Sequence, residues 1–271
     1  MSPTQRESAE AAVSLWTAKP VGGQRSKAAP GTDKYFQDVE AYRYGYETPW
    51  IPRLFGFDKL CGKNVLELGV GLGIDGSNIA SHGAKYTGVD ITQRHLDLAE
   101  QNFRRKGLSG RFIHGDLTAI DLPEKSFDVI YSFGVLHHIE AEEDVIKAVH
   151  RFLKDDGVFM FAVYSKYSFS NGILFAKWIW SGAARRYRFN AYQAHVAEAA
   201  SLDFPVTIKV RSKAEVMRLY SKYFLIAAYC KRGFVSRYLP FIGKYLQPDG
   251  MVLNACGSML GWYHVMIAKK G

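Results

Sequence analysis

The feature that most constrains this chain is a glycine-rich junction between an apolar run and a helical pattern. Residues 65–76 have the sequence VLELGVGLGIDG. The apolar run predicts a buried strand, and the glycines allow the backbone to turn tightly and to approach a ligand closely where a helix begins. We therefore expect a strand, a loop and a helix in succession, with a small molecule bound at the turn.

Short apolar runs alternate with amphipathic helical patterns between residues 64 and 163. Leu96, Ala99 and Phe103, for example, share one helix face at positions i, i+3 and i+7. Alternating strands and helices favour parallel pairing through right-handed crossovers. The fold class is therefore α/β, with a Rossmann-like, doubly wound and mostly parallel sheet. The runs predicted as strands are 65–68, 85–89, 111–114, 127–131 and 158–163.

The glycines fit two ligand-binding patterns. Residues 71–76 match G-x-G-x-x-G, the pyrophosphate cradle of dinucleotide enzymes, whereas residues 67–73 match E-x-G-x-G-x-G. Glu67 and Asp75 place negative charge where a pyrophosphate would need a free helix N-terminus. A ligand that carries positive charge and no phosphate suits the loop better, and S-adenosylmethionine, with a sulfonium and an ammonium group, is such a ligand.

Acidic residues also end the next two predicted strands. Asp90 follows the second strand, where a carboxylate can accept hydrogen bonds from both ribose hydroxyls of an adenosine. Asp116 follows the third strand, where a carboxylate can accept from the adenine amino group. Either could instead have a local role, Asp90 as a helix cap and Asp116 in a turn. Acids at three strand ends together favour a nucleoside ligand.

These motifs resemble those of the class I S-adenosylmethionine-dependent methyltransferases, and most closely the type 11 group of quinone-biosynthesis and natural-product enzymes. The resemblance rests on ELGVGLG at 67–73, Val89-Asp90, Gly115-Asp116-Leu117 and FDVIYSFGVLHHI at 127–139. It implies a seven-stranded sheet with one antiparallel strand. It also implies S-adenosyl-L-methionine as cofactor, held by Glu67, Gly69, Gly71, Gly73, Asp90, Ile91, Asp116, Leu117, Ser132 and Phe133.

Two histidines follow the fourth strand, close to where the transferred methyl group should lie. A hydroxyl acceptor benefits from a general base, and His137 is our first candidate, with His138 second. One of them could instead pack in the core and the other cap a helix. Tyr42 and Arg43, on a helical stripe of aromatic residues, could close over the cofactor, with Arg43 pairing its carboxylate.

Four regions follow from these patterns. Residues 1–60 form an N-terminal helical lid and residues 61–164 the cofactor-binding core. Residues 165–211 form a helical cap, and residues 212–271 complete the sheet with a long insertion between its last two strands. The uncharged stretch 250–268 is interpreted as a loop leading into the final strand rather than as a membrane span.

Positive charge is concentrated in the last third of the chain. Residues 165–271 contain sixteen Lys and Arg against four Asp and Glu, so we expect an anionic partner such as a phosphorylated acceptor or a membrane surface. Residues 217–246 interleave basic and apolar side chains, which favours peripheral membrane contact. A nucleic-acid substrate is not expected, because residues 132–135 lack the Pro-Pro-aromatic run of base methyltransferases. The sequence leaves the oligomeric state open, including a homo-oligomer.

The predicted function is transfer of a methyl group to a small, largely hydrophobic molecule: a natural product, a quinone or an isoprenoid-like compound, with or without a phosphate. The alternatives are a membrane-surface lipid methyltransferase and an NAD(P)-dependent oxidoreductase. No His, Cys or Asp cluster has metal-ligand spacing, so no metal is expected. The N-terminal segment lacks a signal-peptide pattern, and we expect a cytoplasmic protein.

Overall fold

The computed structural model describes residues 3–198, 200 and 206–270. Seven strands form one sheet in the order β3-β2-β1-β4-β5-β7-β6, and β7 runs antiparallel to both of its neighbours. The prediction of a doubly wound, mostly parallel sheet is confirmed. The strands are β1 (Asn64–Leu68), β2 (Lys85–Asp90), β3 (Arg111–His114), β4 (Phe127–Phe133), β5 (Leu153–Tyr164), β6 (Phe224–Arg232) and β7 (Tyr263–Lys270).

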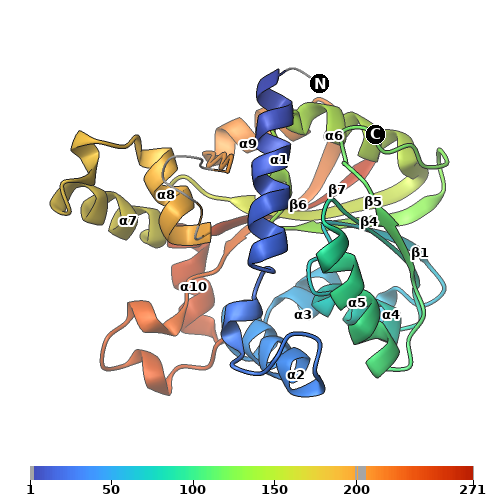
Figure 1. Ribbon diagram of the computed structural model, residues 1–271, viewed down its shortest axis with the longest axis horizontal. Helices are drawn as coiled ribbons and strands as arrows, with labels where there is room; N and C mark the ends of the chain where they lie inside the picture. Colours follow the sequence, from blue (N-terminus) through green and yellow to red (C-terminus); the bar gives the residue numbers. More distant parts are fainter. Residues whose placement is uncertain (1–2, 199, 201–205, 271) are drawn as a thin grey trace.

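Helices cover both faces of the sheet (Figure 1). On one face, α6 (Glu142–Phe152) and α9 (Lys213–Tyr220) pack against β4, β5 and β7. On the other, α3 (Ile51–Phe55), α4 (Ile74–Ser81) and α5 (Gln93–Arg105) pack against β1, β2 and β4. Because the chain order of the strands reverses beside β1, their carboxyl ends leave a crevice there, which is the usual place for a ligand in such sheets.

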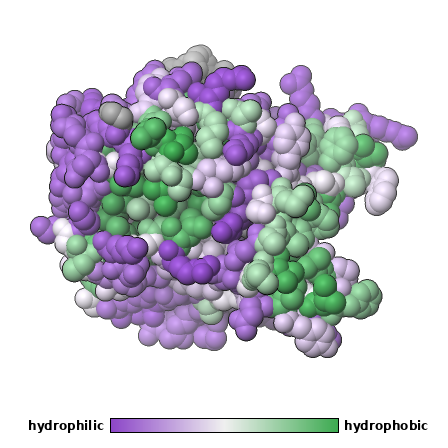
Figure 2. All heavy atoms as spheres, turned by 180° about the vertical axis from the view of Figure 1, so that it is seen from behind, coloured by the Kyte–Doolittle hydropathy of each residue, from purple (hydrophilic) through white to green (hydrophobic). Residues whose placement is uncertain are grey.

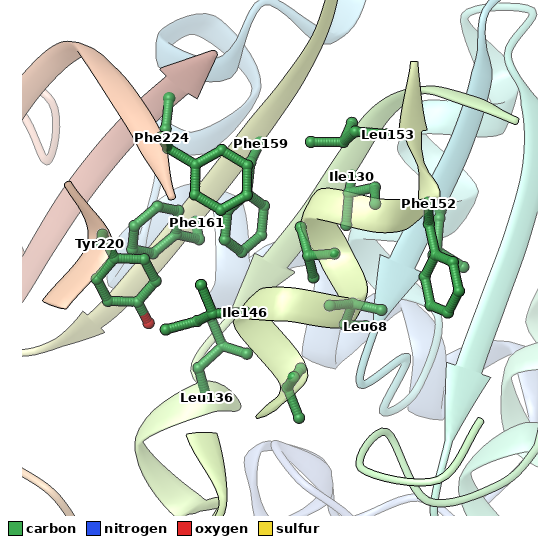
Figure 3. Close-up of a cluster of buried hydrophobic side chains, with 14 of the residues drawn as sticks. Leu68, Ile130, Leu136, Ile146, Phe152, Leu153, Phe159, Phe161, Tyr220 and Phe224 are labelled. Carbon is green, nitrogen blue, oxygen red and sulfur yellow. The ribbon is translucent and has the colours of Figure 1, made fainter. Parts of the chain in front are cut away.

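The larger buried cluster joins the sheet to α6 and α9. Phe159 and Phe161 of β5 stack at 4.4 Å between ring centroids, and Phe161 stacks on Tyr220 of α9 at 4.2 Å. Figure 3 shows these rings beside Ile146 of α6 and Leu68 of β1. This continuous apolar contact fixes the ends of β1 and β4, from which the ligand-binding loops extend.

Further helices come from the N-terminal segment and from the region predicted as a cap. The N-terminal ones are α1 (Pro3–Ala18) and α2 (Asp33–Tyr42), and Figure 1 shows α1 lying across the front of the sheet. The region predicted as a cap contains α7 (Phe169–Trp180) and α8 (Phe189–Glu198). Residues 199 and 201–205 of that region, and residues 1–2 of the predicted lid, lie outside the described residues.

One sequence interpretation was wrong. The stretch 250–268 is not a loop before the last strand, because Met251–Leu260 form helix α10. Gly261, directly after this helix, lies so close to the backbone of Arg232 in β6 that an added Cβ would clash with the Arg232 carbonyl oxygen. Residues 217–246, in which basic and apolar side chains interleave, do not form a single element. They are divided among the end of α9, strand β6 and the loop that follows it.

No helix within the described part of the chain combines the length and the apolar composition needed to cross a bilayer.

Candidate active site

A cavity of about 330 Å³ lies at the carboxyl ends of β1, β2 and β4, beneath α1 and the end of α2. It brings together eleven of the fourteen residues predicted from the sequence: Tyr42, Arg43, Glu67, Gly69, Gly71, Asp90, Ile91, Asp116, Leu117, Phe133 and His138. Gly73, Ser132 and His137 do not line it. The sequence therefore located this cavity, although it did not distinguish every residue on its wall from those behind it.

The glycine loop forms one wall of the cavity. Gly69, Gly71 and Gly73 all have positive φ values, of 77°, 53° and 66°. A Cβ on Gly71 would meet nothing within 4 Å, so this residue faces the open cavity, whereas a Cβ on Gly73 would be 2.9 Å from that of Ala99. Gly73 thus lets α5 pack closely against the loop, and Gly71 lets a ligand approach the backbone.

Asp90 is held rigidly at the end of β2. One carboxylate oxygen accepts hydrogen bonds from the amide and hydroxyl of Thr92, at 2.9 and 2.8 Å, and the other accepts from the Gly71 amide at 3.0 Å. His95 Nδ1 lies 3.2 Å from both oxygens, and His95 Nε2 accepts from the Val21 amide, so the Nδ1–H is the donor to Asp90. Burial opposes ionisation, but the bonds from His95, Gly71 and Thr92 outweigh it and lower the Asp90 pKa.

Glu67 is a buried acid on β1 without a partner of opposite charge in direct contact among the described residues. Its side chain accepts a hydrogen bond from the hydroxyl of Tyr86 and is 4% exposed. Burial, and then the nearby carboxylate of Asp75, raise the pKa of Glu67 well above its usual value. A positively charged ligand in the cavity would favour the ionised form of Glu67.

Arg43 is already paired within the protein. It lies in a π-helical turn (Arg43–Glu47) after α2 and binds both carboxylate oxygens of Asp75, in the first turn of α4. Tyr44 and Tyr131 donate their hydroxyls to the same carboxylate at 2.9 and 2.8 Å. Burial disfavours the charged guanidinium, yet Asp75 raises its pKa well above the usual value. This network holds the N-terminal segment over the glycine loop. The Arg43 guanidinium, which was predicted to pair with the cofactor carboxylate, is already paired with Asp75.

The cavity is strongly acidic. Two arginines, Arg25 and Arg43, line it together with seven carboxylates: Glu47, Glu67, Asp75, Asp90, Asp116, Glu140 and Glu198. Asp75 also stands at the helix N-terminus where a dinucleotide enzyme would place a pyrophosphate, which argues against the oxidoreductase alternative. The wall fits a ligand with positive charge and no phosphate, so the residues present fit S-adenosylmethionine.

Asp116 lines the cavity, and only one of its carboxylate oxygens has a hydrogen-bond partner among the described residues. Its Oδ1 accepts from the amide and hydroxyl of Thr118, both at 2.8 Å, which is the turn geometry considered from the sequence. The turn role and the predicted binding role are compatible, because Oδ1 makes both turn bonds and Asp116 still lines the cavity beside Leu117.

The positions of the two histidines favour His138 over His137 as the candidate base. His137, our first candidate, is fully buried behind the cavity, and its ring lies against that of Tyr164 with centroids 3.7 Å apart. Neither of its ring nitrogens has a hydrogen-bond partner among the described residues. Burial, and then His138, lower its pKa well below the usual value. His138 does line the cavity. Its Nδ1 lies 2.8 Å from the carbonyl oxygen of Thr207, and its Nε2 lies 3.8 Å from Glu198 Oε1.

Two residues beside His138 were not foreseen. The hydroxyl of Tyr164 donates to Glu198 Oε1 at 2.7 Å, and both side chains line the cavity. Tyr164 ends β5, so its place at the carboxyl edge of the sheet was a usable signal. Glu198 ends α8, which folds back over the sheet, and no local sequence pattern marks it. Ser132, predicted to help hold the cofactor, instead donates its hydroxyl to the Leu68 carbonyl at 3.3 Å.

Within the described ranges, no group of three or more His, Cys, Asp or Glu side chains could hold a metal ion.

The fold and the cavity define a Rossmann-like protein with a nucleoside-type site at the carboxyl edge of its sheet. Residues 66–161 match the family model of a methyltransferase domain. The domain belongs to the class I methyltransferases that depend on S-adenosylmethionine, and to their type 11 group, so the class and the cofactor predicted from the sequence are confirmed.

Curated relatives share this central region. The chain is 34% identical over 110 residues to a ubiquinone biosynthesis O-methyltransferase of Pseudomonas syringae pv. tomato, covering 40% of this chain and 47% of that protein. It is 35% identical over 101 residues to squalene methyltransferase 1 of Botryococcus braunii, covering 36% of this chain and 27% of that protein. The matched region therefore spans about half, or less, of these relatives.

Solved structures resemble the chain over nearly its whole length. Magnesium protoporphyrin IX methyltransferase from Synechocystis PCC 6803, solved with bound SAH, superposes with a TM-score of 0.61 at 13% identity, over 97% of this chain and all of that one. A [4+2]-cyclase, SpnF, superposes at 0.54 with 14% identity, over 98% and 93%. At such identities the likeness shows the fold alone, and proteins named for different reactions share it.

Proposed function

We propose that this protein transfers a methyl group from S-adenosylmethionine to a small, largely hydrophobic acceptor that carries an ionisable hydroxyl. The observation that supports this most strongly is the continuity of the cavity. The same 330 Å³ space is bounded by the glycine loop and acidic strand ends and by the His138–Glu198 pair. A donor and an acceptor could therefore meet in one cavity.

The donor end would be formed by the acidic strand ends. Glu67 would face the positively charged methionine portion, Asp90 the ribose hydroxyls, and Asp116 with Leu117 the adenine. When bound, S-adenosylmethionine supplies a methyl group activated by a positively charged sulfur. The chain itself has to hold the acceptor in line with that group and exclude water, because fixed orientation supplies much of the rate.

The acceptor end would be formed by His138 and its neighbours. Because Nδ1–H of a neutral imidazole donates to the Thr207 carbonyl, Nε2 is left as the nitrogen that can accept a proton. The adjacent Glu198 carboxylate would stabilise the imidazolium after proton transfer, and the Tyr164 hydroxyl keeps that carboxylate in place. Such a base suits an acceptor whose hydroxyl must lose a proton before or during methylation.

The remaining wall at this end is apolar and aromatic. Ala12 and Trp16 of α1 line it, and Trp16 meets His138 edge-on with ring centroids 5.7 Å apart. Phe133 and Tyr263 pack against each other at 4.7 Å on the opposite side. An aromatic or isoprenoid-like molecule would bury apolar area here, while its hydroxyl reached the polar pair.

The test combines cofactor binding with methyl transfer. Calorimetry with S-adenosylhomocysteine and with NAD should show binding of the first and none of the second; tight binding of NAD alone would disprove the proposal. Incubation with S-adenosylmethionine bearing a labelled methyl group, and with a set of phenolic quinone precursors, isoprenoid alcohols and amines, should label the hydroxyl compounds. Labelling confined to amines would refute the proposed role of the histidine end.

A further inference from the structure

Exposed apolar side chains are concentrated on one side of the molecule. Of the fourteen large apolar side chains that are exposed in the described residues, eleven lie on α7 and the segment just before it, on the loop 233–250, or on α10. We call this region the lobe surface. Trp180, Phe241 and Met251 are its most exposed members, at 86%, 89% and 86%. In Figure 2 the green atoms of this region cover the projections on the right of the molecule.

The three parts of the lobe surface are joined to one another. Phe169 of α7 packs against Phe234 and Tyr238 of the loop, with ring centroids 5.5 and 5.1 Å apart. The ammonium group of Lys231 donates to the carbonyl oxygens of Tyr167 and Met259, which links the segment before α7 to the end of α10. Figure 1 shows α7 and the loop projecting from the same edge of the molecule. A flat partner could therefore touch both at once.

Basic residues surround these apolar side chains. The stretches 165–190 and 231–262 contain nine Lys and Arg against a single acid, Asp249, which forms an ion pair with Arg53 at 2.7 Å. Seven of the nine are exposed, and across the described chain none of the nine has a carboxylate within 4.0 Å. The exposed ones are Lys166, Lys177, Arg185, Arg186, Arg188, Arg237 and Lys244.

We infer that the lobe surface docks this protein onto an anionic membrane. Aromatic and aliphatic side chains of this kind bury themselves at the boundary between headgroups and acyl chains, while surrounding cations pair with acidic headgroups. A second copy of the chain fits poorly, because a symmetric contact would press one set of unpaired cations against the other. Nucleic acid would match the charge, but it offers nothing to exposed aliphatic side chains such as Ile179 and Met251.

The docking surface is connected to the cavity through the cap. Phe189 at the start of α8 packs against Phe175 and Trp178 of α7, and Glu198 at the end of α8 lines the acceptor end of the cavity. A docked membrane would therefore lie next to the helix that helps to bind the acceptor. The docking inference itself does not depend on the proposed methyl transfer, since vesicle binding is measured without either substrate.

The test is flotation with vesicles of phosphatidylcholine alone and of equal parts phosphatidylcholine and phosphatidylglycerol. The protein should float with the anionic vesicles at low salt, and at least tenfold less with the neutral ones. Trp180→Ser combined with Phe241→Ser should reduce flotation at least tenfold, and so should replacement of Arg185, Arg186 and Arg188 by Gln. Matched controls lie outside the lobe surface: Leu225→Ser, at an exposed position near the start of β6, and Lys85, Arg104 and Arg111→Gln near the opposite edge of the sheet.

Both control variants should float like the parent protein, with circular dichroism showing that all variants are folded. The inference would be overturned by any of three results: no flotation with anionic vesicles; equal losses in the controls and the lobe variants; or a homodimer that the lobe variants separate while vesicle binding stays unchanged. Retention on a nucleic-acid column in place of flotation would also overturn it. Failure to methylate any acceptor would leave it standing.

Discussion

The hydroxyl of Tyr86 donates a hydrogen bond to the buried carboxylate of Glu67, between neighbouring strands at the wall of the cavity. Among the described residues, the Tyr86 hydroxyl is the only hydrogen-bond partner of Glu67. This bond lowers the pKa of Glu67 by less than burial and the nearby Asp75 carboxylate raise it. Glu67 therefore carries a raised pKa, while Tyr86, buried and next to the acid, carries one as well.

Binding of S-adenosylhomocysteine should strengthen as the pH rises through the raised pKa of Glu67. Below that pKa the free protein holds Glu67 protonated, and the cationic ammonium of the ligand must displace the proton; above it the carboxylate is already charged. Calorimetry in two buffers with different ionisation enthalpies should detect proton release on binding. Glu67→Gln should bind more weakly and release no proton. Equal proton release by this variant would assign the effect to another group.

Asp90 should contribute to both cofactor binding and stability. Asp90→Asn removes a charge that accepts from Gly71, Thr92 and His95, and such bonds to a charged group contribute about 1.5–3 kcal/mol. We expect urea unfolding to show a loss of about that size, and S-adenosylhomocysteine affinity to fall about tenfold or more if one ribose bond is lost as well. Asp97→Asn, at an exposed position of the following helix α5, should change neither quantity.

His138 should matter for turnover rather than for cofactor binding. His138→Gln keeps a donor toward Thr207 but removes the base, so kcat should fall by about a hundredfold or more while S-adenosylhomocysteine affinity stays unchanged. Glu198→Gln should give a smaller loss of kcat, because it removes only the charge next to the imidazolium. A His138→Gln enzyme with full kcat would show that the acceptor needs no base from this side chain.

His137→Leu should stabilise the protein or leave its stability unchanged. Both ring nitrogens of His137 are buried and have no partner in the part of the chain that the structure describes, and an unmade hydrogen bond in the interior costs about 1–3 kcal/mol. Leu is similar in size and can pack against Tyr164 in the same place. Thermal unfolding should show an equal or higher Tm, with methyl transfer retained. A large loss of activity without a loss of stability would restore His137 as a functional residue.

The sequence predicted the sheet, and the wall of the cavity that the strand ends form, because their signals are local. The strand Arg111–His114 was predicted with the ends that the structure shows. Glu67, Gly71 and Asp90 were predicted to lie together because they are at or next to strand ends that meet at one edge of the sheet, and all three line the cavity. Helix α10 was missed because an uncharged stretch shows no contrast between its faces. Glu198 was missed because its place depends on how the cap folds back, which no spacing within the cap records.

Separating Arg43 from Asp75 should cause the largest loss of stability among these variants. Their contact joins the N-terminal segment to α4 and is buried, with side chains 17% and 6% exposed. Removing one partner leaves a buried charge uncompensated, so Arg43→Met should lower the free energy of unfolding by about 3–5 kcal/mol. Asp75→Asn on its own should be costly too, because Arg43 then lies buried beside an amide. The double variant should recover part of both losses, since neither charge remains. A double-mutant cycle from urea unfolding measures this coupling, and strictly additive losses would show that the two side chains act independently.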